Sequence, residues 1–437
     1  MSAFGRPGNR IDLGPDAPLE LVLDQSDLAS ADAARAAVER AFDYWLGDRR
    51  RGQEQSDRQL ELIEELVAPT VELRPLLRRE VEAGEAQVLR LTQSQMHVLD
   101  MLRGQRRAAI RGPAGTGKTL LAREKARRLA AEGFATLLVC FNQPLARQLA
   151  DDLADASAPG GLDVLTFHEL CLRLGTEAGT LPSPEPTVKD QAWFDEVLPT
   201  GLDAAIGAGA GGRYHAIVVD EGQDFARSWL ESLELMLGEP GVDVLYVFHD
   251  PEQALYRDDV VATLGLPEYY VEMNCRNTGP IHRFAARYAP GLAGASVLRE
   301  DGREVEVIEA APGRETVEAL RVLLHRLVAD EGLAPWQVAV LTGGSLAKSE
   351  VWRQRRFGNQ VLWNGAYDDA GHSLGLAADQ TPEQPSDTIL CDSIRRFKGL
   401  EREVVVLVEL DKSDPRLEQL LYVGATRARQ HLVLIGR

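Results

Sequence analysis

The segment from Gly112 to Thr119 constrains this chain more than any other. It reads GPAGTGKT and lies between a short apolar stretch, Ala108–Arg111, and a helical pattern over Leu120–Glu132. Glycines let successive backbone N–H groups face phosphate oxygens, and a helix N-terminus adds its positive dipole end. We therefore predict a phosphate-binding loop in which Lys118 reaches the β- and γ-phosphates and Thr119 binds Mg²⁺. The predicted nucleotide contacts are Gly112, Pro113, Ala114, Gly115, Thr116, Gly117, Lys118 and Thr119.

Short apolar stretches alternate with helical patterns from about residue 90 onward. The predicted strands are Ala108–Arg111, Thr136–Phe141, Val164–Phe167, Ala216–Asp220 and Val244–Phe248, then Val305–Glu309, Val338–Leu341, Thr388–Cys391, Val404–Val408 and His431–Ile435. Helices are predicted at 120–132, 145–153, 315–330 and 416–428, and loops at Ala204–Gly212 and 356–387. Such a βαβ series predicts an α/β fold with parallel sheets that are covered on both faces.

A second acidic motif follows the predicted strand that contains Ile217, Val218 and Val219. It reads Asp220-Glu221-Gly222-Gln223-Asp224. A carboxylate at a strand end can hold Mg²⁺, which we assign to Asp220. The next carboxylate, Glu221, can orient or deprotonate an attacking water. Together the two motifs predict binding and hydrolysis of ATP with Mg²⁺.

Residues 1–88 form a predicted N-terminal, mainly helical extension, with helical patterns at 31–47 and 57–87. The net charge of −19 argues mildly against broad electrostatic binding of nucleic acid, but a local basic groove remains open. No apolar run approaches the ~20 residues of a membrane span. We expect a cytoplasmic protein with no membrane partner.

The motifs occur in an order that resembles the superfamily 1 DNA helicases of the UvrD/Rep type, over about residues 90–437. Leu91-Thr92-Gln93-Ser94-Gln95 resembles the Q motif, GPAGTGKT motif I and DEGQD motif II. Motifs Ia, Ib and III are CFNQPLARQL (140–149), TFHEL (166–170) and HDPEQALY (249–256). Motifs IV, V and VI are NCRNT (274–278), SIRRFKGLE (393–401) and LLYVGATRAR (420–429). The amino-acid sequences of these motifs most resemble those of the helicase part of proteins with a nuclease-related (NERD) domain. Residues 1–88 are too short and too helical to supply that nuclease domain.

The resemblance implies two RecA-like domains of the P-loop NTPase class, at 89–272 and 273–437, with ATP between them. It implies that Gln95 reads adenine, Gln253 senses the γ-phosphate and Glu401 lies near the sugar. Arg276 and Arg427 match the two arginine fingers of the family. It also implies translocation 3′ to 5′ on single-stranded DNA, which would contact Phe141, Thr166, His168, Tyr256, Ser393 and Arg395.

Several positions depart from the family pattern. Cys275 stands where an aromatic residue usually stacks on adenine, and Ser393-Ile394-Arg395 replaces the usual Thr-x-His. Tyr256 is followed by Arg-Asp-Asp rather than by an aromatic and basic run. The short intervals between motifs also predict that the accessory insertions that grip duplex DNA are small or absent.

The leading hypothesis is a helicase or translocase whose ATPase activity is stimulated by single-stranded DNA. A second hypothesis is a nucleotide-controlled switch that gates a partner nuclease or effector, in DNA repair or anti-phage defence, with little unwinding. An RNA-directed motor is a third alternative.

Overall fold

The computed structural model describes residues 26–27, 29–46, 76–154, 159–182, 190–210, 213–238, 242–255, 260–292, 294–375 and 380–436. The chain divides into two units, Met1–Arg74 and Pro75–Arg437. In the first unit, helix α1 (Ala31–Leu46) confirms the helix predicted at 31–47. The predicted helix at 57–87 lies outside the described residues up to position 75.

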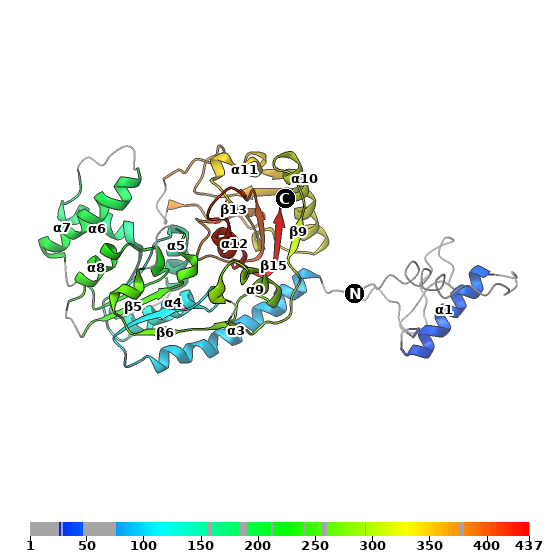
Figure 1. Cartoon of the computed structure of the whole chain (residues 1–437), viewed down its shortest axis with the longest axis horizontal. Coiled ribbons are helices and arrows are strands. Elements are labelled where there is room, and N and C mark those ends of the chain that lie inside the picture. The colour runs from blue at the N-terminus through cyan, green and yellow to red at the C-terminus, as the bar shows by residue number, and fades with distance from the viewer. Residues whose placement is uncertain are drawn as a thin grey trace. The chain divides into compact units, whose positions relative to one another are not determined.

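The second unit contains two large sheets built mainly of parallel strands (Figure 1). The first has the order β3-β2-β4-β5-β1-β6 and is parallel throughout. Its strands are β1 (Arg107–Arg111), β2 (Thr136–Cys140), β3 (Leu162–Thr166), β4 (Ala216–Val219), β5 (Val244–His249) and β6 (Glu268–Tyr270). Every residue of β2, β4 and β5 is buried, as expected for parallel strands covered on both faces.

The second sheet has the order β11-β12-β13-β10-β14-β15-β9. Its strands are β9 (Glu306–Ile308), β10 (Val338–Thr342), β11 (Arg356–Phe357), β12 (Gln360–Trp363), β13 (Ile389–Ser393), β14 (Arg402–Val408) and β15 (Ala428–Ile435). Only the β11–β12 pair is antiparallel among its described pairings. A separate parallel pair joins β7 (Met273–Asn274) to β8 (Ser296–Val297).

Helices cover both sheets. They are α3 (Leu77–Met101), α4 (Lys118–Ala131), α5 (Gln143–Leu153), α6 (Phe167–Ala178), α7 (Leu198–Ala205), α8 (Arg227–Leu235), α9 (Gly279–Ala285), α10 (Arg314–His325), α11 (Glu350–Gln354) and α12 (Leu417–Ala425). None of the helices in these described ranges is long and apolar enough to cross a membrane.

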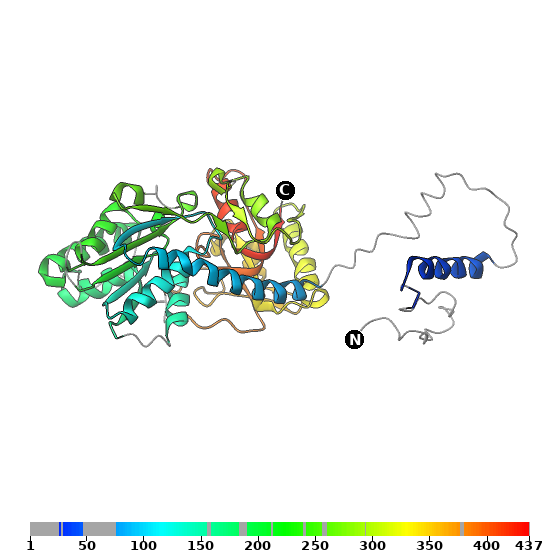
Figure 2. The same cartoon turned by 90° about the horizontal axis from the view of Figure 1, so that it is seen from below.

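Helix α3 runs alongside both sheets (Figure 2). At its N-terminal end, Leu77 and Val81 pack into an apolar cluster with the second sheet. At its other end, Leu99 packs into the cluster that contains Ile110 of the first sheet. That cluster also contains Leu341 and Leu407 of the second sheet, so the two sheets share buried apolar contacts. The predicted boundary between residues 88 and 89 falls inside α3, and the domain limits stay a prediction.

All ten predicted strands are present, within a few residues of their predicted ends. Three predictions were wrong. The stretch 356–387 is not all loop, because β11 and β12 pair and extend the second sheet. The stretch from Ala204 is not all loop, because α7 ends at Ala205 and continues into a π-helical segment, Ile206–Ala210, in which Gly209 (φ 109°) leaves the helical conformation. The helix predicted at 416–428 ends at Ala425, and β15 begins at Ala428.

Candidate active site between the two sheets

The phosphate loop connects β1 to α4, as predicted. Gly115 and Gly117 have φ values of 81° and 77°, in the left-handed region where a glycine costs least. Gly117 directly precedes α4, which begins at Lys118. A helix N-terminus preceded by such a turn presents backbone N–H groups to an anion. The local geometry matches what the sequence predicted for Gly112–Thr119.

The side chain of Lys118 is folded into this loop and is buried. Its Nζ donates to the carbonyl oxygens of Gly112 (2.7 Å) and Pro113 (2.9 Å) and lies 3.7 Å from Oδ2 of Asp250. Burial lowers the pKa of Lys118, although the nearby charges of Asp250 and Glu221 oppose the shift. Its present acceptors are loop carbonyls, so the ammonium group lies against the backbone of the loop.

Asp220 and Thr119, the predicted Mg²⁺ ligands, lie next to each other, and their binding of a metal stays a prediction. Asp220 follows β4, and its carboxylate interacts with the Thr119 hydroxyl. Oδ1 of Asp220 accepts from the N–H of Glu221 (3.0 Å), while the buried Oδ2 has no hydrogen-bond partner. Burial, with the neighbouring charge of Glu221, raises the pKa of Asp220. A buried carboxylate oxygen without a partner beside a hydroxyl fits Mg²⁺, a cation that takes oxygen ligands.

The described residues contain no group of three or more His, Cys, Asp or Glu side chains arranged to hold a metal ion.

Glu221 sits in a left-handed backbone conformation, with φ 56° and ψ 42°. Oε2 of Glu221 accepts a hydrogen bond from Nε2 of Gln223 (2.5 Å). Burial alone would raise the pKa of Glu221, but the positive charges of Lys398 and Arg427 outweigh it and lower the pKa. The carboxylate is therefore ionised and can accept a proton or orient a water molecule.

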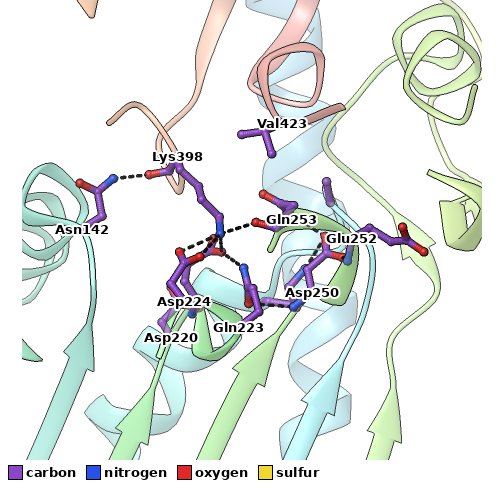
Figure 3. Close-up of polar contacts among 12 residues, drawn as sticks. Asn142, Asp220, Gln223, Asp224, Asp250, Glu252, Gln253, Lys398 and Val423 are labelled. Atoms are coloured by element: carbon purple, nitrogen blue, oxygen red, sulfur yellow. Dashed lines mark hydrogen bonds and ion pairs between the residues drawn. The ribbon is translucent and has the colours of Figure 1, made fainter. Parts of the chain in front are cut away.

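Asp250 and Gln253 follow β5, and Gln253 faces Lys398 (Figure 3). Nε2 of Gln253 donates to Oδ2 of Asp250 (2.6 Å). Gln223 accepts through Oε1 from the N–H of Asp250 (2.9 Å), which ties the turn after β4 to the turn after β5. Because β4 and β5 are neighbouring parallel strands, their carboxyl ends place these turns side by side.

Arg427 reaches this cluster from the second sheet. It lies in the turn between α12 and β15, and 1% of the residue is exposed. Its Nη2 donates to Oε1 of Gln253 (2.9 Å), and its Nε donates to the carbonyl of Val423 (3.1 Å). The structure thus brings Arg427 to Gln253, the predicted γ-phosphate sensor, and the roles of both residues stay predictions.

Arg276 and Glu401 form an ion pair beside the loop. They border a cavity of about 230 Å³ that is also lined by Gly115, Gly117 and Cys275. Burial alone would raise the pKa of Glu401, but Arg276 and other arginines lower it. The cavity adjoins the phosphate loop. Cys275 forms the part of the cavity wall where the family pattern has an aromatic side chain.

Lys398 is a site residue that the sequence analysis did not single out. Its buried Nζ donates to both carboxylate oxygens of Asp224 (2.7 Å each) and to the carbonyl of Gln253 (2.7 Å), and it lies 3.7 Å from Oε2 of Glu221 (Figure 3). Asn142 donates to the carbonyl of Lys398 from the first sheet (2.5 Å). Lys398 lies within the SIRRFKGLE motif, so the sequence showed the residue but not the distant residues that it contacts.

Tyr422 was also missed. Its hydroxyl donates to Oδ2 of Asp250 (3.1 Å) and accepts from the N–H of Ala114 in the phosphate loop (2.9 Å). Tyr422 comes from α12 next to the second sheet, so it joins the loop to that helix directly. The motif LLYVGATRAR contains it, but an aromatic residue in an apolar helix reads as core from sequence alone.

The predicted nucleic-acid contacts Phe141 and His168 lie together at the ends of β2 and β3. Their rings meet edge to face with centroids 5.6 Å apart, and Phe141 stacks on Trp229 at 6.2 Å. Nε2 of His168 lies 3.1 Å from the carbonyl of Phe194. Thr166 is buried and caps α6, with its hydroxyl bonded to Glu169. Contact of these residues with a nucleic acid stays a prediction.

The remaining predicted contacts are dispersed. Arg395 donates to the carbonyl of Gly343 (3.2 Å) and pairs with Asp414 (3.3 Å), and Oγ of Ser393 accepts from the N–H of Arg396 (3.3 Å). Tyr256 lies outside the described residues, as does the side chain of Gln95 within α3. The roles predicted for all four stay predictions.

Comparison with known proteins gives one family match. Residues 388–435 match the family model of the UvrD-like helicase C-terminal domain. The matched stretch includes Lys398, Glu401, Tyr422 and Arg427. A search of curated proteins found no match to this sequence.

Similar solved structures include two of arterivirus nonstructural protein 10 (helicase). The one with DNA has 13% identity and a TM-score of 0.39, and the match covers 75% of this chain and 60% of that chain. The other has 13% identity and a TM-score of 0.37, with 75% and 59% covered. The structure of PRRSV helicase has 12% identity and a TM-score of 0.37, with 75% and 52% covered. This chain therefore spans less than two thirds of each helicase.

Proposed function

We propose that this chain is an ATP-hydrolysing motor of the superfamily 1 helicase class that moves on single-stranded DNA in the 3′ to 5′ direction. The observation that carries the proposal is the junction of the two sheets. There a phosphate loop with Lys118 and the Asp220–Thr119 pair faces Arg427, which bonds Gln253 across the junction. The match of residues 388–435 to a helicase C-terminal domain supports the same class.

The first sheet supplies the groups that bind the phosphates. The N–H groups of the loop and the ammonium group of Lys118 take the anionic oxygens, which requires Lys118 to leave its present carbonyl acceptors. Asp220 and Thr119 would hold Mg²⁺, which neutralises charge that develops on the phosphate oxygens. Glu221 orients the attacking water, because its carboxylate is ionised and lies directly after Asp220.

Two arginines supply the positive charge that stabilises the transition state. Arg427 precedes β15 of the second sheet and bonds Gln253, and Arg276 follows β7 and lines the cavity beside the loop. Arginine planes of this kind spread charge over the transferring phosphoryl group. Because Arg427 also bonds Gln253, any shift of the second sheet changes the groups that contact the γ-phosphate.

Binding of single-stranded DNA across the two sheets would couple to this site through Asn142 and Lys398. Asn142 follows Phe141, a predicted base contact, and donates to the carbonyl oxygens of Arg396 and Lys398 (2.7 and 2.5 Å). Lys398 in turn bonds the carbonyl of Gln253. A DNA strand that displaces Phe141 would therefore shift Gln253 through the side chains of Asn142 and Lys398.

The test is steady-state ATP hydrolysis by the full chain with and without single-stranded DNA. We expect stimulation by DNA, and we expect Lys118→Ala to abolish turnover because it removes the charge at the phosphates. Arg79→Ala, at an exposed position on α3, is the matched control and should leave the rate unchanged. An identical rate with and without DNA would overturn the motor, and turnover in Lys118→Ala would overturn the site.

The same assay separates the alternatives from the sequence analysis. Stimulation by RNA rather than DNA would favour an RNA-directed motor. Turnover that responds to neither nucleic acid, but changes when a co-purified nuclease or effector is added, would favour the nucleotide-controlled switch.

A further inference from the structure

Two buried asparagines shape the turn that carries Arg276. Asn274 and Asn277 flank it, and both are fully buried. Oδ1 of Asn274 accepts from the N–H groups of Arg276 and Asn277 (3.1 Å each), and Nδ2 of Asn274 donates to Oδ1 of Asn277 (3.1 Å). The backbone at Arg276 is therefore set by side-chain amides rather than by a helix or a long strand.

The amide of Asn277 also reaches the second arginine. Its Nδ2 donates to the carbonyl oxygens of Thr426 (3.1 Å) and Ala428 (2.7 Å), the residues on either side of Arg427. A primary amide has two N–H donors, so this bonding uses the whole donor capacity of Asn277. The side chain of Asn277 thus holds the residues on both sides of Arg427, and Asn277 directly follows Arg276 in the chain.

The phosphate loop packs directly on the same amides. The carbonyl of Gly115 accepts from the N–H of Cys275 (3.0 Å). A Cβ atom on Gly115 would lie 2.4 Å from Oδ1 of Asn274 and 2.5 Å from Oδ1 of Asn277, which is closer than real contacts allow. The loop therefore approaches this amide pair with backbone alone, and its position depends on where the pair lies.

Arg299 supports the same arrangement from behind. Its buried guanidinium donates from Nη1 to the carbonyl oxygens of Arg276 (2.9 Å) and Arg429 (3.2 Å). Nη2 donates to Oε1 of Gln430 (2.5 Å). The segments that contain the two arginines are thus joined twice, by Asn277 and by Arg299.

We propose that Asn277 is a positioning residue that holds Arg276 and Arg427 as one unit against the phosphate loop. The inference rests on the proposed function, because it assigns a role to Asn277 in the hydrolysis assigned there. Asn277 need not touch the substrate. Its bonds fix the two arginine backbones, and an error of about 1 Å in such groups can cost roughly 10²-fold in rate.

The test compares Asn277→Leu, which keeps most of the volume and removes both donors, with Asn364→Leu. Asn364 is a matched buried asparagine beside the second sheet: its Nδ2 donates to the carbonyl of Cys391 (2.8 Å), and it lies outside the loop and the arginine turns. We expect Asn277→Leu to lower kcat roughly 10- to 100-fold with the KM for ATP changed less than about threefold. Asn364→Leu should lose stability but keep kcat.

A double-mutant cycle with Arg427→Ala identifies the route of the effect. Once Arg427 is absent, Asn277→Leu should lower the rate by a smaller factor than it does in the wild-type chain, because the part of its effect that acts through Arg427 is already lost. The affinity of the same variants for ADP–aluminium fluoride, which mimics the transition state, gives a second cycle that needs no turnover. Should Asn277→Leu not fold, Asn277→Ser, whose one hydroxyl cannot span both carbonyls, takes its place.

The proposal is overturned if Asn277→Leu keeps kcat within about twofold of the wild-type value, or if its loss matches that of Asn364→Leu. It is equally overturned if the effects of Asn277→Leu and Arg427→Ala multiply. A wild-type chain that does not hydrolyse ATP would instead overturn the proposed function, so the two failures are distinct.

Discussion

Nη2 of Arg427 lies 2.9 Å from Oε1 of Gln253, and this hydrogen bond joins the turn before β15 to the turn after β5. Both residues are buried, with 1% of each exposed. Gln253 also donates to Asp250, which in turn lies 3.7 Å from Lys118. A short chain of side chains thus connects the second sheet to the phosphate loop.

The first prediction concerns Arg427. Replacing it with alanine should lower kcat by roughly 10³-fold or more, the loss typical of an arginine that stabilises phosphoryl transfer. Affinity for ADP should change little, because ADP lacks the phosphate that the arginine serves. Steady-state hydrolysis and titration with a fluorescent ADP analogue measure the two quantities.

Arg321→Ala is the control for that experiment, because Arg321 is exposed on α10 and pairs only with Glu318 among the contacts described for it. A rate for Arg427→Ala within about tenfold of wild type would contradict the assignment, since the expected loss is far larger.

The second prediction concerns the buried pair of Lys398 and Asp224. Lys398→Met should lower the free energy of unfolding by about 3–5 kcal/mol, because it leaves the Asp224 carboxylate buried without its cation. Adding Asp224→Asn should recover much of that loss, because the uncompensated charge disappears. Urea unfolding of the single and double variants measures this, and a double variant no more stable than Lys398→Met would refute the explanation.

The third prediction compares two glycines that share a left-handed backbone. Replacing either Gly115 (φ 81°) or Gly133 (φ 95°) with alanine should strain the backbone, and this strain should lower the free energy of unfolding by about 1–2 kcal/mol. Only Gly115→Ala should also abolish ATP hydrolysis, because its Cβ meets Asn274 and Asn277 while that of Gly133 meets open space. Equal hydrolysis by the two variants would show that close packing at Gly115 is unimportant.

The fourth prediction concerns Asp392, which follows Cys391 on β13. Burial raises its pKa from 3.8 to about 6, although Arg396, 3.5 Å away, opposes the shift. A raised pKa in the folded state means that stability is lost as the pH rises from about 4 to about 6. Asp392→Asn should therefore stabilise the protein by up to about 3 kcal/mol above pH 6.

The gain from Asp392→Asn should shrink as the pH falls below about 6 and approach zero only below about pH 4, because the carboxyl is then protonated in both the folded and the unfolded state. Urea unfolding at pH 7.5 and pH 4.5 measures the difference. A stabilisation that is the same at both pH values would argue against burial of an ionised Asp392.

Much of the fold was predictable because strands in parallel sheets are short, apolar and bounded by turns. β2, β4 and β5 show this pattern, and all three lie where it indicated. The pattern failed where strands were marginal. β11 contains two residues and β12 four, and both lie among glycines and polar residues. Pairing of β12 with β13, and of β11 with β12, makes them strands rather than composition.

The helix ends show the same division. Ala425 and Arg427 lie in one apolar and basic run that favours a longer helix, but β15 starts at Ala428 and pairs with β14. Sheet formation therefore ended α12 early and put Arg427 into a turn. That turn lets its side chain point at Gln253.

The sequence by itself determined the local structure of the loop at Gly112–Thr119 and of the turn at Asp220–Glu221, because both are local. Their residues are close in the chain, and a strand followed by a turn brings them together. Only the tertiary structure decided which distant groups complete the site. Asn277 meets the flanks of Arg427, Lys398 meets Asp224, and Tyr422 meets Ala114. These contacts join segments that are far apart in the chain, and packing of two separate sheets sets their geometry, which no local pattern of residues encodes.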